Sequence, residues 1–243
     1  MPYTLELLQP WADRARKIGL RDFAFTDHDR YHEGVDFDVM DRFREKNPDL
    51  KIRAGIELDN DPVHSPAGRK WVESNWDRLD FVLGSVHFLK QDSMFDNVPA
   101  GASQFEGGDI DEIYADYFRR VREIASTGLV DCLAHLDLIK IHGHRSKSSV
   151  GKLVEETLDL IKSRNLAIEL STAGWRKPVN EAYPSDEIVR LALRKGIPFT
   201  IASDAHSHVQ LGENFDRLAE KMAKLGIREA CVYEKHKRMV RVL

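Results

Sequence analysis

Short apolar runs alternate along the chain with longer segments in which apolar residues recur at helical spacing. The apolar runs predict strands at residues 22–28, 52–58, 80–87, 130–137, 166–171, 197–204 and 229–233. The amphipathic segments predict helices at residues 5–18, 36–47, 66–77, 111–127, 149–164, 185–195 and 212–225. This alternation indicates parallel β/α units, and the unbroken apolar character of the strands is typical of a sheet buried on both faces.

One long segment, residues 88–110, interrupts the alternation and is predicted to be irregular. Loops of this length in compact proteins are often functional lids. No linker rich in Pro, Gly or Ser divides the chain, so we expect one domain over residues 1–243.

The composition and charge of the chain argue against nucleic acid and membranes as its partners. The 243 residues are 42% hydrophobic and carry a formal net charge of −4, which gives no basic surface for nucleic acid or an anionic membrane. No apolar stretch is long enough to span a bilayer and no signal sequence follows Met1, so we expect a cytoplasmic protein. The cysteines, Cys132 and Cys231, both fall in predicted strands and are expected to be buried thiols. Nothing in the sequence indicates an oligomer.

Side chains that can bind metal ions follow five of the predicted strands. They are His28, Glu57, His87, His135, Asp204 and His206. Because the carboxyl ends of parallel strands meet at one edge of a sheet, these imidazoles and carboxylates are expected to converge. Such ligands, held by rigid elements, suit a cluster of divalent cations. The sequence therefore predicts a metal-dependent enzyme.

The remaining histidines divide into two groups. His32, His64 and His236 are interpreted as ordinary surface or structural residues, whereas His142, His144 and His208 lie in loops expected to border the same mouth. Asp27, Asp29 and Asp137 flank predicted ligands and can orient imidazoles by hydrogen bonding.

A second motif lies in the loop at residues 171–185, STAGWRKPVNEAYPS. Gly174 allows a turn, and Arg176 presents a planar guanidinium that can bind two phosphate oxygens. Arg145, in the preceding loop, is expected to reach the same anion. Beside a cationic centre, these arginines predict a small phosphorylated substrate.

These motifs carry a family resemblance. The segments FTDHD, GIEL, GSVHF, HLDLIKIHGHR, ELSTAGWRKPVNEAYPS and IASDAH resemble the PHP (polymerase and histidinol phosphatase) superfamily, and specifically its monofunctional histidinol-phosphate phosphatase type. The resemblance extends over nearly the whole chain and implies an α/β fold, a distorted seven-stranded TIM-like (β/α) barrel. It also implies a centre of two or three divalent ions, zinc, manganese or iron.

By this resemblance the six predicted ligands match metal ligands of the family, with Glu57 bridging two ions, and Arg176 and Arg145 match phosphate contacts. The implied reaction is hydrolysis of L-histidinol phosphate to L-histidinol and phosphate, in histidine biosynthesis. Asp27 or His208 is the expected donor of a proton to the leaving alkoxide, and acidic residues of the 88–110 loop are expected to receive the cationic end of the substrate.

The family pattern opens with a strand that carries an H-x-H pair, and this sequence has no counterpart of it. We therefore expect a barrel that lacks its first strand and leaves two sheet edges unpaired. Two other functions stay open: a PHP phosphatase for another small phosphomonoester, and an inactive metal-binding paralogue or truncated product.

Overall fold

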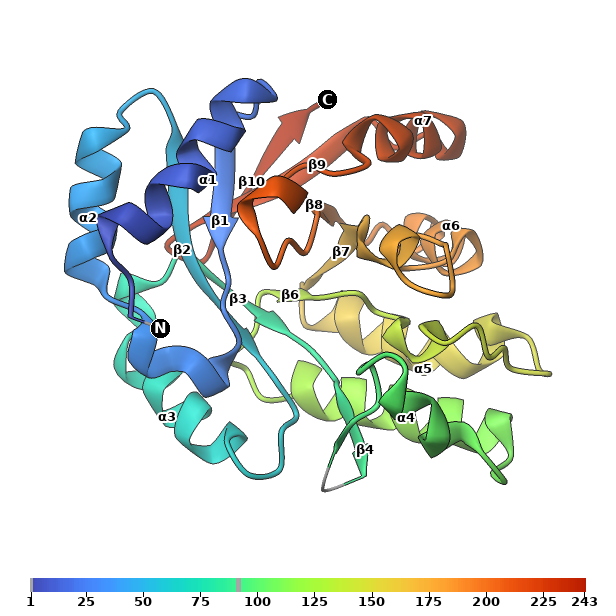
Figure 1. The fold of residues 1–243 in the computed structure, drawn as a ribbon. Helices are drawn as coiled ribbons and strands as arrows, with labels where there is room; N and C mark the ends of the chain where they lie inside the picture. Colours follow the sequence, from blue (N-terminus) through green and yellow to red (C-terminus); the bar gives the residue numbers. More distant parts are fainter. Residues whose placement is uncertain (1, 91–92) are drawn as a thin grey trace.

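The computed structural model describes residues 2–90 and 93–243, and its centre is a curled parallel sheet surrounded by helices (Figure 1). The sheet has six strands in the order β1-β2-β3-β6-β7-β8. Their bounds are β1 Asp22–Phe25, β2 Lys51–Leu58, β3 Phe81–Gly84, β6 Cys132–Leu133, β7 Ala167–Ser171 and β8 Phe199–Ala202. The predicted α/β, TIM-like fold is confirmed.

The helices lie close to their predicted positions. They are α1 Leu5–Lys17, α2 Phe37–Lys46, α3 Ser65–Ser74, α4 Ile110–Ala125, α5 Val150–Ser163, α6 Asp186–Arg194 and α7 Phe215–Leu225. Polar caps fix several starts: the Thr4 hydroxyl accepts a hydrogen bond from the Leu7 N–H, and the Asp36 carboxylate accepts two at the start of α2. Gly226, at φ +77°, ends α7 in the left-handed conformation that glycine adopts freely.

The sheet is open between β1 and β8, since no described strand pairs with the outer edge of either. A cavity of about 980 Å³ lies inside the curled sheet and is lined by both edge strands. Residues of β2 and β7 are almost all buried, whereas most of β8 is half-buried despite its apolar sequence. The Arg14 Nε donates to the Leu211 carbonyl oxygen at 3.2 Å, so α1, which precedes β1, contacts the chain between β8 and α7. The expected barrel without one strand is what the described residues form.

The structure contains three strands that the sequence did not predict, β4, β5 and β10. The segment at residues 88–110 is not irregular throughout: β4 (Phe88–Lys90) and β5 (Ser93–Met94) pair antiparallel, and a 3₁₀ helix covers Ala100–Phe105. The last predicted strand, β9 (Glu229–Glu234), pairs with an unpredicted strand, β10 (Lys237–Val242). The residues of β10 are exposed or half-exposed. Its sequence, KRMVRV, is correspondingly polar and does not show the apolar run from which buried strands were predicted.

The β9–β10 hairpin packs against the sheet at the end remote from the predicted ligands. Tyr233 stacks on Phe81 of β3 with ring centroids 5.7 Å apart, and the same cluster buries Cys231 with Cys132. Both cysteines are free thiols, as predicted. Among the described residues, no helix is long and apolar enough to cross a membrane.

The hairpin turn is fixed by His236, which lies flat on the Trp76 ring with centroids 3.6 Å apart. Its Nδ1 is 2.8 Å from an Asp131 carboxylate oxygen and its Nε2 is 3.0 Å from the Trp76 carbonyl oxygen. Only the imidazolium can donate to both acceptors. Burial alone would lower the pKa of His236, but these two acceptors raise it overall.

We therefore predict a pH-dependent contribution of His236 to stability. Because its folded pKa is raised, the contribution is fully present below the unfolded pKa of about 6.5 and is lost as pH rises through the folded pKa. Between about pH 5.5 and about pH 9, the wild type should lose about 1 kcal/mol more unfolding free energy than His236→Gln. Urea unfolding of both proteins at several pH values measures this difference, and parallel pH profiles would contradict the assignment.

Candidate metal centre

Three of the predicted ligands meet in a buried group above the centre of the sheet. Glu57 lies in β2, His87 follows β3 and His135 follows β6, three strands that are neighbours in the sheet. A Glu57 carboxylate oxygen, Oε1, is 3.1 Å from the His135 Nε2 and 3.8 Å from the His87 Nε2. One ligand atom from each residue lies within 4.8 Å of the others. Two imidazoles and a carboxylate are a donor set that fits a divalent ion such as zinc.

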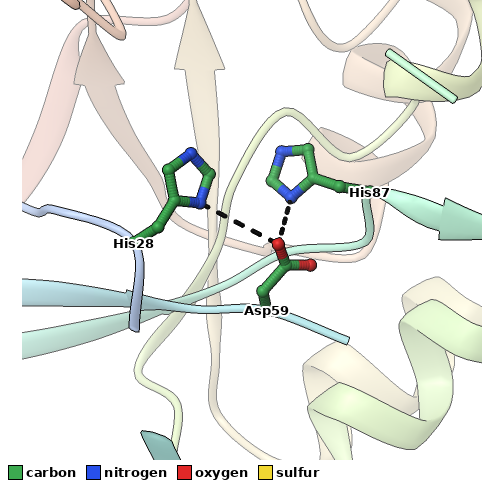
Figure 2. A group of neighbouring side chains, drawn as sticks. All are labelled: His28, Asp59 and His87. Atoms are coloured by element: carbon green, nitrogen blue, oxygen red, sulfur yellow. Dashed lines mark hydrogen bonds and ion pairs between the residues drawn. The ribbon is translucent and has the colours of Figure 1, made fainter. Parts of the chain in front are cut away.

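Asp59, which the sequence analysis missed, sets the orientation of His87. Its Oδ2 is 3.0 Å from the His87 Nδ1 (Figure 2). The other ring nitrogen of His87, Nε2, is 3.8 Å from the Glu57 Oε1. The Arg30 Nη2 donates to the same oxygen at 2.9 Å. A ligating histidine commonly has its second ring nitrogen bonded to a carboxylate in this way. The one indication of Asp59 in the sequence was its spacing, since it follows the predicted ligand Glu57 by two residues.

His28 approaches the group from β1. Its Nδ1 is 3.9 Å from an oxygen of Glu57 and 3.9 Å from the Asp59 Oδ2, and its ring lies edge-on to His87 (Figure 2). His28, Asp59 and His87 form a second set of side chains close enough to hold an ion. Burial lowers the pKa of His28, which favours the neutral form that binds metals.

The buried charges compensate one another. Burial would raise the pKa of Glu57, but the surrounding histidines hold it well below its usual value. Burial would lower the pKa of His87, but carboxylates around it, Asp59 foremost, raise it to about 10. Burial acts in the same direction on His135, whose pKa is raised overall by Glu57. A metal ion would replace protons in balancing these carboxylates.

Asp204 and His206 lie at the open side of the site, after β8. Both line the cavity, and the His206 Nδ1 is 3.6 Å from an Asp204 carboxylate oxygen. The His206 side chain is 69% exposed, and its ring centroid is 6.4 Å from that of His28. Among the described residues, these two belong to no tight group of three ligands.

The two predicted phosphate-binding arginines have different surroundings. Arg176 lies in a 3₁₀ helix, Ala173–Arg176, and its Nη2 donates to the carbonyl oxygens of Ser203 and Asp204. Its Nη1 is buried, has no hydrogen-bond partner among the described residues, and lies 3.6 Å from a Glu213 carboxylate oxygen. Arg145 is half-exposed and pairs with Glu181 at 2.8 Å.

Comparison with known proteins places this site in a family. A model of the PHP domain matches residues 6–173 of the chain, well over half of it. The chain belongs to the PHP domain family.

Its relatives share names as well as sequence. A Deinococcus radiodurans protein named "Probable histidinol-phosphatase" is 34% identical over 94% of this chain and 90% of its own length. The Bacillus subtilis protein named "Histidinol-phosphatase" is 24% identical over 89% of this chain and 93% of its own length. The crystal structure of histidinol phosphate phosphatase from Lactococcus lactis, complexed with zinc, L-histidinol and phosphate, superimposes with a TM-score of 0.75 at 19% identity, over 95% of this chain and 92% of that one.

The two candidate proton donors of this PHP site lie in different environments. Asp27 lines the cavity, and its Oδ2 accepts a hydrogen bond from the Tyr3 hydroxyl. His208 is exposed at the start of a short 3₁₀ helix, His208–Gln210, and does not line the cavity.

The other loop residues also differ in their surroundings. The His142 Nε2 is 2.6 Å from the Phe95 carbonyl oxygen, and His144 stacks on Phe105. Of the acidic residues in the 88–110 loop, Asp109 caps α4 and Asp92 lies outside the described residues.

Glu169 is a second cavity residue that the sequence analysis missed. It lies in β7, almost fully buried, and its Oε1 accepts a hydrogen bond from the His135 backbone N–H at 3.3 Å. Burial raises its pKa to about 8. An acid within the apolar run LAIELS was the available signal, since a buried carboxylate inside a barrel needs a function or a partner.

Removing Asp59 is predicted to weaken metal binding without removing a residue of the Glu57 group. Asp59→Ala frees the His87 ring to turn, and loss of such a partner typically costs about 10- to 100-fold in metal affinity. Competition with a chromogenic zinc chelator measures the change. The neighbouring Asp61→Ala is the matched control, since Asp61 bonds to His64 and to the backbone before α3. Equal zinc affinity in both variants would exclude this role for Asp59.

Proposed function

We propose that the chain is a metal-dependent phosphomonoesterase that hydrolyses L-histidinol phosphate to L-histidinol and phosphate. The observation that carries the chemistry is the buried convergence of Glu57, His87 and His135 from three neighbouring strands. The substrate follows from the relatives: the chain is 34% identical to a protein named as a histidinol-phosphatase over 90% of that protein's length.

The proposed centre holds two or three divalent ions, with zinc, manganese and iron as the candidates. Glu57, His87 and His135 hold one ion, and His28, Asp204 and His206 contribute to the others. Bound divalent ions supply Lewis acidity, which activates water near neutral pH and neutralises phosphoryl oxygens. Zinc is the ion named for the Lactococcus lactis structure.

The protein side chains orient the substrate and supply the proton. The Arg176 Nη1 makes no hydrogen bond among the described residues and would turn from the Glu213 carboxylate, 3.6 Å away, to a phosphoryl oxygen. Arg145 is half-exposed and would reach the same anion by leaving its pair with Glu181. The oxygen of a water bonds to phosphorus while the bond from phosphorus to the histidinol oxygen breaks. We assign the proton given to the leaving alkoxide to Asp27, and this assignment is supported by its position in the cavity lining, whereas His208 is exposed outside it.

One observation favours a second candidate, a metal-binding protein without phosphatase activity. The sheet is open between β1 and β8, and Asp204 and His206 beside this gap have no third ligand close by among the described residues. An incomplete centre could bind one ion and still fail to hydrolyse a phosphomonoester.

The substrate prediction is that purified chain loaded with zinc or manganese hydrolyses L-histidinol phosphate faster than any member of a panel of sugar and nucleotide phosphates. Chelation should abolish the activity and added metal should restore it. Phosphate release measured across the panel distinguishes the three functions. A faster rate on another phosphomonoester would identify a different PHP phosphatase, and no hydrolysis with fewer than about two bound ions would favour the inactive metal-binding protein.

Glu57→Gln is predicted to lower kcat/KM for this substrate by about 100-fold or more, because the amide keeps the shape but removes the buried negative charge that binds the ion. Circular dichroism checks that the fold is retained. Glu112→Gln, on the exposed face of α4, makes the same chemical change away from the site. Wild-type kcat/KM in Glu57→Gln would refute the role of Glu57.

A further inference from the structure

Arg176 contacts the backbone that carries Asp204. The arginine follows β7 and the aspartate follows β8, the neighbouring strand. One guanidinium nitrogen, Nη2, donates to the Ser203 carbonyl oxygen at 2.7 Å and to the Asp204 carbonyl oxygen at 2.8 Å. The Arg176 side chain is only 16% exposed, so solvent screens these contacts little.

Asp204 needs such a contact because its backbone is in an uncommon conformation. Its φ is +47°, in the left-handed region, which costs most residues with a Cβ about 1–2 kcal/mol and which Asp adopts more readily than most. Such a conformation persists only where the surroundings fix it. The turn after β8 is held elsewhere as well: the Ser203 Oγ accepts from the Gly212 N–H at 3.2 Å, and the Gln210 side chain accepts from the His206 N–H at 2.9 Å.

Contacts to the Asp204 peptide itself are fewer. Its carbonyl oxygen receives the Arg176 bond and lies 3.3 Å from the Nδ1 of His206. The His206 side chain is 69% exposed and that of Arg176 only 16%, so Arg176 is the better shielded of the two contacts to this peptide.

We propose that Arg176 is a positioning residue for Asp204: its Nη2 fixes the left-handed turn that directs the Asp204 carboxylate into the cavity. This inference rests on the proposed metal centre and adds a role to the phosphate contact proposed above. The two nitrogens have different roles: Nη2 is occupied by backbone carbonyls, whereas Nη1 makes no hydrogen bond in the described part of the chain and lies 3.6 Å from a Glu213 carboxylate oxygen.

The two roles of Arg176 predict different results in the absence of phosphate. A residue that only binds phosphate leaves metal affinity unchanged when it is removed. A residue that positions Asp204 lowers the affinity for the ion that Asp204 holds, by about 10- to 100-fold, the range typical of residues that orient ligands.

The experiment measures zinc and manganese binding, without phosphate, by competition with a chelator in wild type, Arg176→Met, Asp204→Ala and the double variant. Arg176→Met keeps the aliphatic stem and removes the guanidinium. Arg176→Gln replaces it if the methionine variant does not fold. The positioning role predicts that the double variant binds metal no more weakly than Asp204→Ala, because both changes act through one carboxylate.

Arg217→Met is the matched control. Arg217 lies over the ring of Trp175, the neighbour of Arg176, with its guanidinium carbon 4.3 Å from the ring centroid. The Arg217→Met substitution removes the same charge near Arg176 without removing a contact to the Asp204 turn. The Arg217→Met variant is therefore expected to bind metal with wild-type affinity.

Each outcome decides a different point. If Asp204→Ala weakens binding and Arg176→Met does not, the positioning role is overturned while the proposed metal centre stands. If Asp204→Ala itself leaves binding unchanged, Asp204 is not a ligand, and this part of the proposed function fails. Additive losses in the double variant would show that Arg176 acts independently of Asp204.

Discussion

The buried negative charge of Glu57 is the constraint on which the rest of the site depends. A carboxylate removed from water is strongly disfavoured unless cations or hydrogen-bond donors surround it. Here His28, His87 and His135 supply that compensation, and each comes from a different strand end. No single element of this chain could place three imidazoles around one carboxylate. The curvature of the parallel sheet is therefore a requirement of the site as well as a consequence of packing.

The side chains around the ligands are as informative as the ligands. His135 has φ +22° and Asp204 has φ +47°, so two predicted ligands stand on backbone that is sparsely populated for residues with a Cβ. Each bonds to a polar side chain: the His135 N–H donates to Glu169, which is buried, and the Asp204 carbonyl oxygen accepts from Arg176, which is mostly buried. Both strained ligands are therefore held by a polar side chain of the β7 unit: His135 by Glu169 in β7, and Asp204 by Arg176 in the turn after β7.

The sequence predicted the elements better than the contacts. Apolar runs identified the six strands of the sheet, and predicted metal ligands lie at the ends of five of them, because buried parallel strands and their carboxyl-terminal edge leave a clear pattern. Asp59 and Glu169 were missed because an acid near an apolar run carries no sign of its partner, which lies on another strand. β10 was missed for a related reason: it forms by pairing with β9, while its own side chains are exposed or half-exposed and leave no apolar run. What the sequence could not provide was pairwise geometry across strands.

The burial of the predicted ligands decreases from the centre of the sheet to its open edge. Glu57, His87 and His135 stand over its centre and are buried, whereas Asp204 and His206 stand beside the gap between β1 and β8, where His206 is largely exposed. Ligands held by packing lose little freedom when they bind an ion, but exposed ligands must be ordered in the same step. An ion at the central group should therefore bind more tightly than one at the open edge. The open edge, and the residues that fix its turn, then determine whether this chain holds a single ion or the cluster that phosphoester hydrolysis needs.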